Sequence, residues 1–428
     1  MNATGDRATG MGTGASETTD GGSALISAVR AGDTALVKSL LQEDSDPDMR
    51  EAAFCLAVRT YAGDIAQLLL QHGADAGQSS PDELLPLREA VASGSPALVE
   101  ALLDARIRGR YPESELLETR DLARHWHEAG AGAELRRRTG AKETLVRTRV
   151  QDDEYYSIGE LTLGGTSVRD GHAAILTDLE ELLGIRASFE ELMARALDHD
   201  QDHAAWGRAT ILLAHRRDQE TWAAAAALRT HPDPSHRLFG AEVLRLTHLF
   251  DDSDAEAFAG PALDIFIDWS TKETDLTVLT EVLNALGEHT DSRADAALLA
   301  YAGYPDGGVR CAVAAGFGTE SELPAFSDDV REALLVLMTD VDTAVRRGAC
   351  LTVGQGRDRA PVLVEAMAAL LDDADRQVQV AAVQGLALHD DERCVAAARR
   401  LGPPQPGFLA EEHYLDAAWR YEWRRYGR

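Results

Sequence analysis

The sequence is poor in cysteine, lysine and aromatic residues. Its four cysteines stand alone with no Cys-x-x-Cys pair, and aromatic residues make up 6% of the 428 residues. Isolated cysteines argue against a disulfide framework or a paired-cysteine zinc site and favour buried thiols in a reducing cytoplasm. Lysine occurs only at Lys38, Lys142 and Lys272, which together with the Ala and Gly content is typical of a GC-rich bacterial genome.

Long apolar runs and catalytic motifs are also missing. No stretch approaches the roughly 18 consecutive apolar residues of a membrane span. Residues 1–22 are rich in Gly, Thr, Ala and Ser, which predicts a disordered tail and no signal peptide. No Ser-His-Asp spacing, nucleophile elbow or nucleotide-binding glycine fingerprint stands out. We therefore predict no catalytic residue and no cofactor.

The net charge is −30 at pH 7. Such a surface repels the phosphates of nucleic acids and anionic membranes, and it attracts basic proteins. The predicted partners are therefore one or more proteins, possibly basic, without nucleic acid or membrane. The alternative is that the acidity only keeps a long chain soluble.

Three segments near the N-terminus repeat one pattern. Aligned on Gly32, Tyr61 and Gly94, they carry apolar residues four and eight positions downstream. That spacing places the apolar residues on one stripe of a helix. Each segment predicts a helix-turn-helix unit, although a left-handed backbone at Tyr61 would be strained. The downstream residues are Leu36, Leu40, Ile65, Leu69, Leu98 and Leu102.

This pattern resembles the ankyrin repeat. Gln71 to Asp75 reads like the exit of that family's helix into its turn, and Leu85 to Arg88 resembles its Thr-Pro-Leu-His motif. The resemblance implies stacked repeats over residues 23–140, with a fourth, degenerate unit at Leu116 to Arg138.

A second period begins near Asp198 and aligns on aspartates. Mostly apolar residues follow each aspartate at three, seven and eleven positions, on one helical face. The aspartate can cap the helix N-terminus. Gly287, Gly318 and Gly354 are expected to end their helices. The aligned aspartates are Asp202, Asp233, Asp275, Asp306, Asp342 and Asp375.

The second pattern resembles the HEAT repeat, whose second helix often carries Val-Arg after the aspartate. The resemblance implies a HEAT-like array over residues 198–402. In that family the Asp and Arg of successive repeats can form a ladder along the stack. The residues that would form it are Asp306, Arg310, Asp342 and Arg346, with Asp375 in the next repeat; Trp206, Leu279 and Gln379 hold the arginine position elsewhere.

The connector between the arrays, residues 141–197, has no repeat. Leu145 to Val150 and Leu161 to Leu163 predict two short strands of a β-hairpin, and Ala173 to Leu183 predicts an amphipathic helix. Gly164-Gly165 lacks the Lys and spacing of a phosphate-binding loop. A linker is favoured over a ligand site.

Asp198 to His203 brings carboxylates and imidazoles together. His199, Asp200 and His203 are the candidate metal ligands, since His199 and His203 can share a helix face. The segment fails as an EF-hand because His203 stands where that loop needs Gly. A polar turn between helices, with Asp202 as a cap, is the favoured interpretation.

The last segment, residues 403–428, carries aromatic and basic residues together. Leu415, Trp419, Trp423 and Tyr426 form one helical stripe, with arginines among them. Such residues can stack on bases or grip an acidic peptide, whereas a lid for the terminal repeat is the favoured interpretation. The candidate partner-binding residues are Trp419, Arg420, Trp423 and Arg424.

Together these patterns predict an all-α, bipartite solenoid, ankyrin-like and then HEAT-like. Because solenoids present long surfaces, the predicted function is a non-catalytic scaffold or adaptor for proteins. One alternative is an acidic inhibitor or immunity-type protein that masks a basic partner. Another is a HEAT-like lyase or a metal-dependent enzyme centred near His199 and His203. The sequence does not indicate the oligomeric state.

Overall fold

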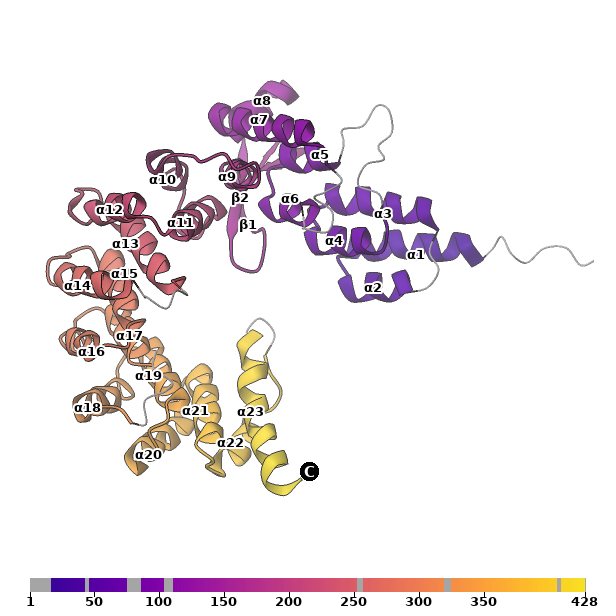
Figure 1. The fold of residues 1–428 in the computed structure, drawn as a ribbon. Helices are drawn as coiled ribbons and strands as arrows, with labels where there is room; N and C mark the ends of the chain where they lie inside the picture. Colours follow the sequence, from indigo (N-terminus) through magenta and orange to yellow (C-terminus); the bar gives the residue numbers. More distant parts are fainter. Residues whose placement is uncertain are drawn as a thin grey trace, which may run out of the picture. The chain divides into compact units, whose positions relative to one another are not determined.

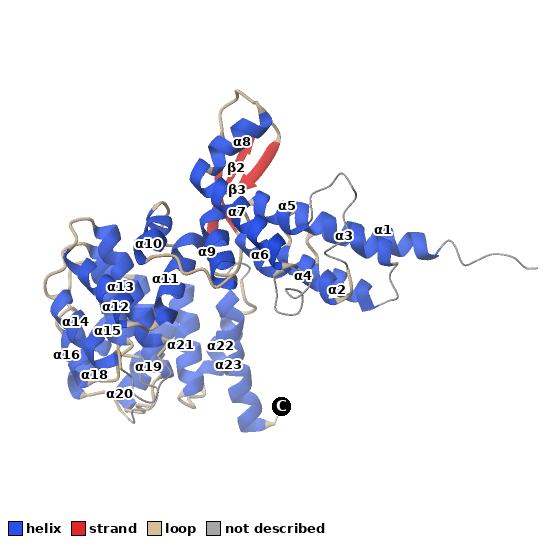
Figure 2. Cartoon of the chain, turned by 45° about the horizontal axis from the view of Figure 1, so that its top comes forward, coloured by secondary structure: helices blue, strands red, loops and turns tan. Residues whose placement is uncertain are grey.

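The computed structural model describes residues 17–42, 46–74, 86–103, 111–251, 257–318, 325–405 and 409–427. The chain divides into two compact units, Met1–Ala209 and Thr210–Arg428. Both are built from paired helices, as predicted, and a small sheet lies in unit 1 (Figure 1, Figure 2). The expected repeat residues Asp75 and Leu85 lie outside the described residues, as do residues 1–16 of the expected tail; α1 begins at Glu17.

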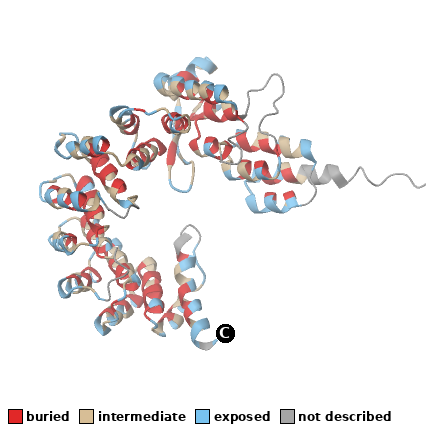
Figure 3. Ribbon diagram, in the orientation of Figure 1, coloured by how far each residue is buried: buried red, intermediate tan, exposed pale blue. Residues whose placement is uncertain are grey.

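Unit 1 begins with three helix pairs that stack in two rows. The first helices pack on one another in the order α1, α3, α5, and the second helices in the order α2, α4, α6. Their apolar stripes form one core (red in Figure 3), in which Leu69, Leu98 and Leu102 are fully buried. The pairs are α1 (Glu17–Ala31) with α2 (Thr34–Gln42), α3 (Pro47–Arg59) with α4 (Gly63–Gln71), and α5 (Pro86–Ser93) with α6 (Pro96–Leu102).

The aligned column lies in the turn within each pair, and its backbone is left-handed. Gly32 has φ of 67°, Tyr61 of 58° and Gly94 of 77°. Glycine adopts this conformation without steric penalty, whereas Tyr61 adopts it at a steric cost. The turn is the same in all three pairs, so a specific set of contacts must compensate at Tyr61.

A fourth helix pair is interrupted by an insertion. Helix α7 (Glu113–Ala129) packs on α5, and α9 (His172–Leu182) packs on both α7 and α6. Because α9 takes the place of a second helix, the expected fourth unit at Leu116 to Arg138 contributes only α7 to this pair. The insertion holds α8 (Ala131–Thr139) and the sheet, and α10 (Phe189–Leu197) and α11 (Ala204–Arg216) follow α9.

The insertion forms a three-stranded antiparallel sheet in the order β1-β2-β3, one strand more than the predicted hairpin. β1 (Val146–Gln151) pairs with β2 (Ser157–Leu163), and β2 pairs with β3 (Thr166–Arg169). Gly164 and Gly165 make the β2–β3 turn with φ of 58° and 79°. The sequence pattern missed β3 because four residues are too few to show an alternation of apolar and polar side chains.

Unit 2 repeats a helix pair along two rows. The first row packs in the order α13, α15, α17, α19, α21, α23. Each of its helices also packs on a partner from the second row. The pairs are α12 (Gln219–Ala227) with α13 (Pro234–Leu249), α14 (Ala259–Ser270) with α15 (Leu276–Gly287), α16 (Ser292–Leu299) with α17 (Gly307–Gly316), α18 (Asp328–Leu337) with α19 (Thr343–Gln355), α20 (Pro361–Ala369) with α21 (Arg376–Leu388), and α22 (Arg393–Leu401) with α23 (Leu409–Tyr426). No described helix is long and apolar enough to cross a membrane.

The aligned aspartates of unit 2 cap the helices of the first row. Each accepts a hydrogen bond from a backbone N–H in the first turn, as Asp306 does from Val309 and Asp342 from Ala344. In unit 1 the corresponding cap of α11 is His203 instead of Asp202, since the His203 Nδ1 accepts from the N–H of Ala205. The other capping aspartates are Asp233, Asp275 and Asp375.

The glycines of this row serve close packing more than helix termination. Gly354 lies inside α19, and a Cβ there would stand 2.7 Å from the Cα of Gly385 in α21. A Cβ on Gly287 would stand 2.3 Å from the Cα of Gly316. The expectation that Gly354 ends its helix is wrong, because its lack of a side chain is what lets α19 and α21 approach.

Candidate functional site

The candidate metal residues His199 and His203 lie together, and their third neighbour is Asp170. Asp170 follows β3, and its Oδ1 accepts hydrogen bonds from the His203 Nε2, 3.0 Å away, and from the N–H of Gly159, 2.7 Å away. The rings of His199 and His203 are stacked, with centres 3.7 Å apart and planes at 9°. Asp170, His199 and His203 are close enough to be considered as ligands of one ion.

Asp200 does not join this cluster. Its carboxylate binds the Arg149 guanidinium at 2.8 and 3.1 Å, and the Arg149 Nε donates to the Ser157 hydroxyl. The sequence missed Asp170 because it stands 29 residues before His199, and only the β3–α9 junction brings it near.

The stacked histidines are arranged for hydrogen bonding more than for metal binding. Burial and the neighbouring His203 lower the pKa of His199 to about 4, so its ring is neutral at pH 7. Burial alone would raise the pKa of Asp170, but hydrogen bonds from His203 and Gly159 outweigh it and lower that pKa. Two parallel rings cannot both aim an in-plane nitrogen at one ion about 2.0–2.1 Å away. The cluster as it stands ties the sheet to the start of α11.

In unit 2, a repeated arginine joins successive helix pairs. The Arg310 guanidinium binds Asp340 through two hydrogen bonds of 2.7 Å, and Arg346 binds Asp373 at 2.8 and 2.9 Å. Arg237 binds Glu273 in the same way, at 2.9 and 2.8 Å. The hydrogen bonds from Arg310 lower the pKa of Asp340, which keeps it ionised.

The acids of this ladder are not the capping aspartates that the resemblance implied. Asp340 and Asp373 stand two residues before the caps Asp342 and Asp375. Each also accepts a hydrogen bond from the backbone N–H of that cap. The capping carboxylates are engaged by their own helices, so the arginine of the preceding pair binds the next acid upstream. An acid two residues before the cap is the sequence signal that the alignment overlooked.

Helix α23 ends the first row and is held by a buried ion pair. The Arg376 guanidinium binds Glu411 at 2.6 and 2.9 Å, and it also donates to the carbonyl of Leu401. The Glu411 side chain is fully buried. Ala417, Ala418 and Tyr421 are buried where α23 packs on α21. These contacts hold α23 against α21.

The two tryptophans of α23 face solvent. Trp419 is 60% exposed and Trp423 57%, whereas the expected stripe would have buried them. A shallow cavity of about 240 Å³ lies beside Trp423, lined also by Leu388, Arg420 and Arg424. Helix α23 packs on α21 with its alanine face and leaves Trp419 and Trp423 exposed; the side chain of Tyr426 lies outside the described residues.

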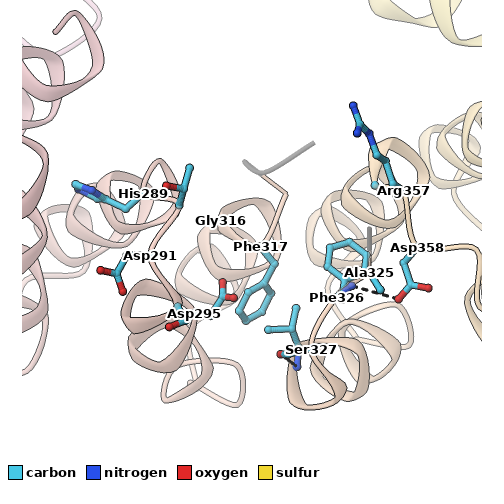
Figure 4. Close-up of a pocket in the computed structure, with 14 residues that line it drawn as sticks. His289, Asp291, Asp295, Gly316, Phe317, Ala325, Phe326, Ser327, Arg357 and Asp358 are labelled. Atoms are coloured by element: carbon cyan, nitrogen blue, oxygen red, sulfur yellow. Dashed lines mark hydrogen bonds between the residues drawn. The ribbon is translucent and has the colours of Figure 1, made fainter. Parts of the chain in front are cut away.

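A second cavity, of about 180 Å³, lies between the α16–α17 and α18–α19 pairs. Figure 4 shows the rings of Phe317 and Phe326 in it, with the carboxylates of Asp291 and Asp295 on one side. The imidazole of His289 points away from Phe317 and stacks on His248, with ring centres 4.1 Å apart. This cavity can admit a side chain, and it offers no paired nucleophile and base among its lining residues.

The comparisons with known proteins bear on unit 1. A family model described as "Ankyrin repeats (3 copies)" matches residues 14–111, which hold the first three helix pairs. An X-ray structure of YibA from E. coli is 14% identical, over 55% of this chain and 93% of that one, with a TM-score of 0.40. A TM-score of that size supports no argument. The search of curated proteins finds no match.

Residues 14–111 are thus three ankyrin repeats, a module that indicates protein interaction.

Proposed function

We propose that this chain is a non-catalytic adaptor for proteins, with ankyrin repeats at one end and a HEAT-like array at the other. The HEAT-like assignment is supported by the paired helices, the aspartate caps and the arginine ladder of unit 2. Two continuous rows of helices expose long surfaces, which suit extended contacts with another protein.

The observation that carries the proposal is a charged strip on the first-helix row of the ankyrin end. Arg59 of α3 lies 3.6 Å from Glu89 of α5, and Arg88 of α5 lies 2.7 Å from Glu118 of α7. All four side chains are at least 35% exposed. Exposed pairs contribute little to stability, so these charges remain available to a partner.

The hydrogen bonds of His203, the histidine best placed for catalysis, support a non-catalytic role. The Nδ1 of His203 accepts from a backbone N–H and its Nε2 faces Asp170, so neither nitrogen is a free base. Among the described residues no disulfide joins the four cysteines, and burial raises the pKa of Cys350 and Cys394 to about 12. Thiols that form no disulfide, two of them poorly ionised, support a reducing compartment such as the cytoplasm.

The test is affinity capture of the full chain from its own cells, with Arg59→Glu/Arg88→Glu as the variant. Arg293→Glu is the matched control, because Arg293 is 53% exposed and pairs with Asp264 in unit 2. We expect a stoichiometric protein partner that the double variant loses and the control retains. Its affinity should fall as salt is added, because the contact with the strip is between charges. Absence of any retained protein with the wild-type chain would refute the adaptor.

A further inference from the structure

A shallow cavity follows the line of contact between α21 and α23. Its volume is about 240 Å³, and Ala387 and Leu388 at the C-terminal end of α21 form one wall. The other wall belongs to α23, where residues three and four positions apart lie on one face of the helix. The α23 residues that line the cavity are Ala417, Arg420, Trp423 and Arg424.

Two large apolar side chains of this cavity remain in contact with water. Trp423 is 57% exposed and Leu388 is 40% exposed, and they come from different helices. Trp419 is 60% exposed as well, but it is not among the described residues that line the cavity. Single exposed apolar residues are common, whereas apolar side chains that share a cavity with arginine are typical of a protein-binding site. Trp423 is therefore the tryptophan of the expected aromatic stripe that is placed to contact a partner.

The charged residues in the described lining of the cavity are both arginines. Arg420 donates to the carbonyl of His413, 3.2 Å away, and forms no ion pair within the described residues. Arg424 lies 3.4 Å from the carbonyl of Ala387 and 3.5 Å from the carboxylate of Asp390, which is 74% exposed. Exposed contacts of this length contribute little to stability, so both guanidiniums can bind a further carboxylate.

We propose that this cavity binds a segment of a partner protein that inserts one bulky apolar side chain beside Trp423 and places a carboxylate beside Arg420 and Arg424. The apolar side chain would exclude water from the guanidiniums, which strengthens their ion pairs with the carboxylate. The net charge of −30 does not prevent this contact, because physiological salt largely screens charges more than about 8 Å apart. The inference rests on the proposed function only in assuming that the chain binds proteins.

Other occupants fit this cavity less well. A nucleic acid requires cations that follow its phosphates, whereas the exposed carboxylates of Asp416 and Asp390 stand beside the two arginines and would repel them. A site for a small molecule typically measures about 300–1,000 Å³ and buries most of its ligand, whereas this cavity is smaller and shallow. A single protruding side chain with a carboxylate next to it matches both the size and the charge.

The test is the anisotropy of a fluorescein-labelled peptide, Ala-Ala-Leu-Glu-Glu-Ala-Ala with blocked termini, titrated with the full chain. One comparison peptide has alanine in place of leucine, and the other has glutamine in place of both glutamates. We expect the first peptide to bind with a dissociation constant below about 1 mM. Each comparison peptide should bind at least about tenfold more weakly, since it lacks either the apolar contact or the charge-assisted hydrogen bonds.

Variants on α23 separate the cavity from the general charge of the helix. Arg420→Glu and Arg424→Glu should each weaken the peptide at least about tenfold. Arg425→Glu makes the same change of charge at an exposed arginine that is not among the described lining residues, and it should bind as wild type does. In the same way Trp423→Ser should lose the peptide and Trp419→Ser should retain it.

Tryptophan fluorescence gives an independent measure. In Trp419→Phe, Trp423 is the only tryptophan more than 7% exposed, so its quenching by acrylamide should fall when the peptide is bound. A wild-type chain that does not bind the peptide, or equal losses in the Arg420 and Arg425 variants, would overturn the proposal. Tighter binding of an oligothymidylate than of the peptide, or self-association of the chain that Trp423→Ser abolishes, would replace it with another occupant. None of these results would touch the adaptor, whose partner is measured through the Arg59 and Arg88 variant.

Discussion

The guanidinium of Arg169 lies over the ring of Tyr61, 4.0 Å from its centre. The Tyr61 hydroxyl donates to the carbonyl of Ser167, 3.2 Å away, so the ring is held by two residues of β3. These contacts explain how a tyrosine occupies the left-handed turn that glycine fills in the neighbouring repeats. The cation–π contact and the buried ring offset a strain of about 1–2 kcal/mol.

The same arginine links the sheet to the next repeat. Arg169 Nη1 donates to Asp152 at 2.7 Å, and Asp152 also accepts from the hydroxyl of Ser95 and the N–H of Ala97 in the first turn of α6. The insertion thus fastens onto the turns of the second and third ankyrin repeats.

Substitutions at Tyr61 should separate strain from contact. Tyr61→Ala loses the ring but keeps a Cβ on the left-handed backbone, so the strain remains. Tyr61→Gly loses both the ring and the strain. We expect both variants to be less stable than wild type, with the alanine variant lower by about 1 kcal/mol. Hydrogen exchange of α3 and α4 measures this local stability. An alanine variant as stable as the glycine variant would show that the turn is not strained.

The repeat patterns predicted the fold, because apolar side chains at fixed helical offsets leave a strong signal. The rows of helix pairs and the aspartate caps follow from such offsets, whereas the left-handed turn at Tyr61 depends on its contacts with β3. The interruption between α7 and α9 left no comparable signal. Its four-residue β3 is too short for alternation, and α9 is separated in sequence from the helix on which it packs.

Long-range contacts set the limit at the sites. Asp170 joins His203 across 33 residues, and Arg346 reaches Asp373 across 27, so neither partner could be read from local spacing. The sequence pattern also did not show which face of α23 is buried. The stripe of aromatic residues is the more apolar face, but α21 packs on the small Ala417 and Ala418, and Trp419 and Trp423 stay exposed.

Acid should destabilise unit 1 through His172. This residue is 1% exposed, its ring stacks on Trp126 with centres 4.7 Å apart, and burial lowers its pKa to about 3. In the unfolded chain the pKa is about 6.5, so between these values only the unfolded state binds the proton. Stability should therefore fall as the pH drops below about 6.5, by up to about 1.4 kcal/mol per pH unit for this one group.

The measurement is urea unfolding of wild type and His172→Phe at several pH values from neutral to mildly acidic. The phenylalanine retains a ring against Trp126 and removes the titration, so its stability should depend less on pH. His413→Gln, at an exposed position of α23, is the control and should follow wild type. Equal pH dependence in all three proteins would mean that other groups dominate.

The stacked histidines should hold no tightly bound metal. The dialysed chain is expected to contain no stoichiometric zinc by elemental analysis, and added Zn²⁺ should leave its melting temperature unchanged. His203→Ala should lose about 1 kcal/mol because α11 loses its cap, and His203→Asn should lose less because asparagine can replace it. Copurified metal that disappears in His203→Ala would contradict this and revive the metal-enzyme alternative.

The ladder in unit 2 should need arginine specifically. Arg346 donates to both oxygens of Asp373 and to the carbonyls of Asp340 and Val341. Lysine is a point charge and cannot match this fork, so Arg346→Lys should cost about 1–2 kcal/mol. Hydrogen exchange of α19 and α21 gives the local value. Arg293→Lys, at an exposed pair, should change little, and equal effects at the two sites would mean that the ladder contributes no more than a surface pair.

The lid should depend on one buried pair. Arg376→Ala removes the guanidinium from Glu411, whose carboxylate is fully buried. Both hydrogen bonds from Arg376 reach Oε1 of Glu411, and its Oε2 has no partner within the described residues. An uncompensated buried charge costs about 3 kcal/mol, reduced somewhat here because Arg376 is itself 23% exposed. Exchange of the α23 amides should therefore accelerate strongly while that of α13 and α15 stays as in wild type. Arg399→Ala, which breaks the largely exposed pair with Glu422, should cost less than about 1 kcal/mol. If the two substitutions loosen α23 equally, the buried pair is not what holds the lid, and the alanine face against α21 must hold it alone.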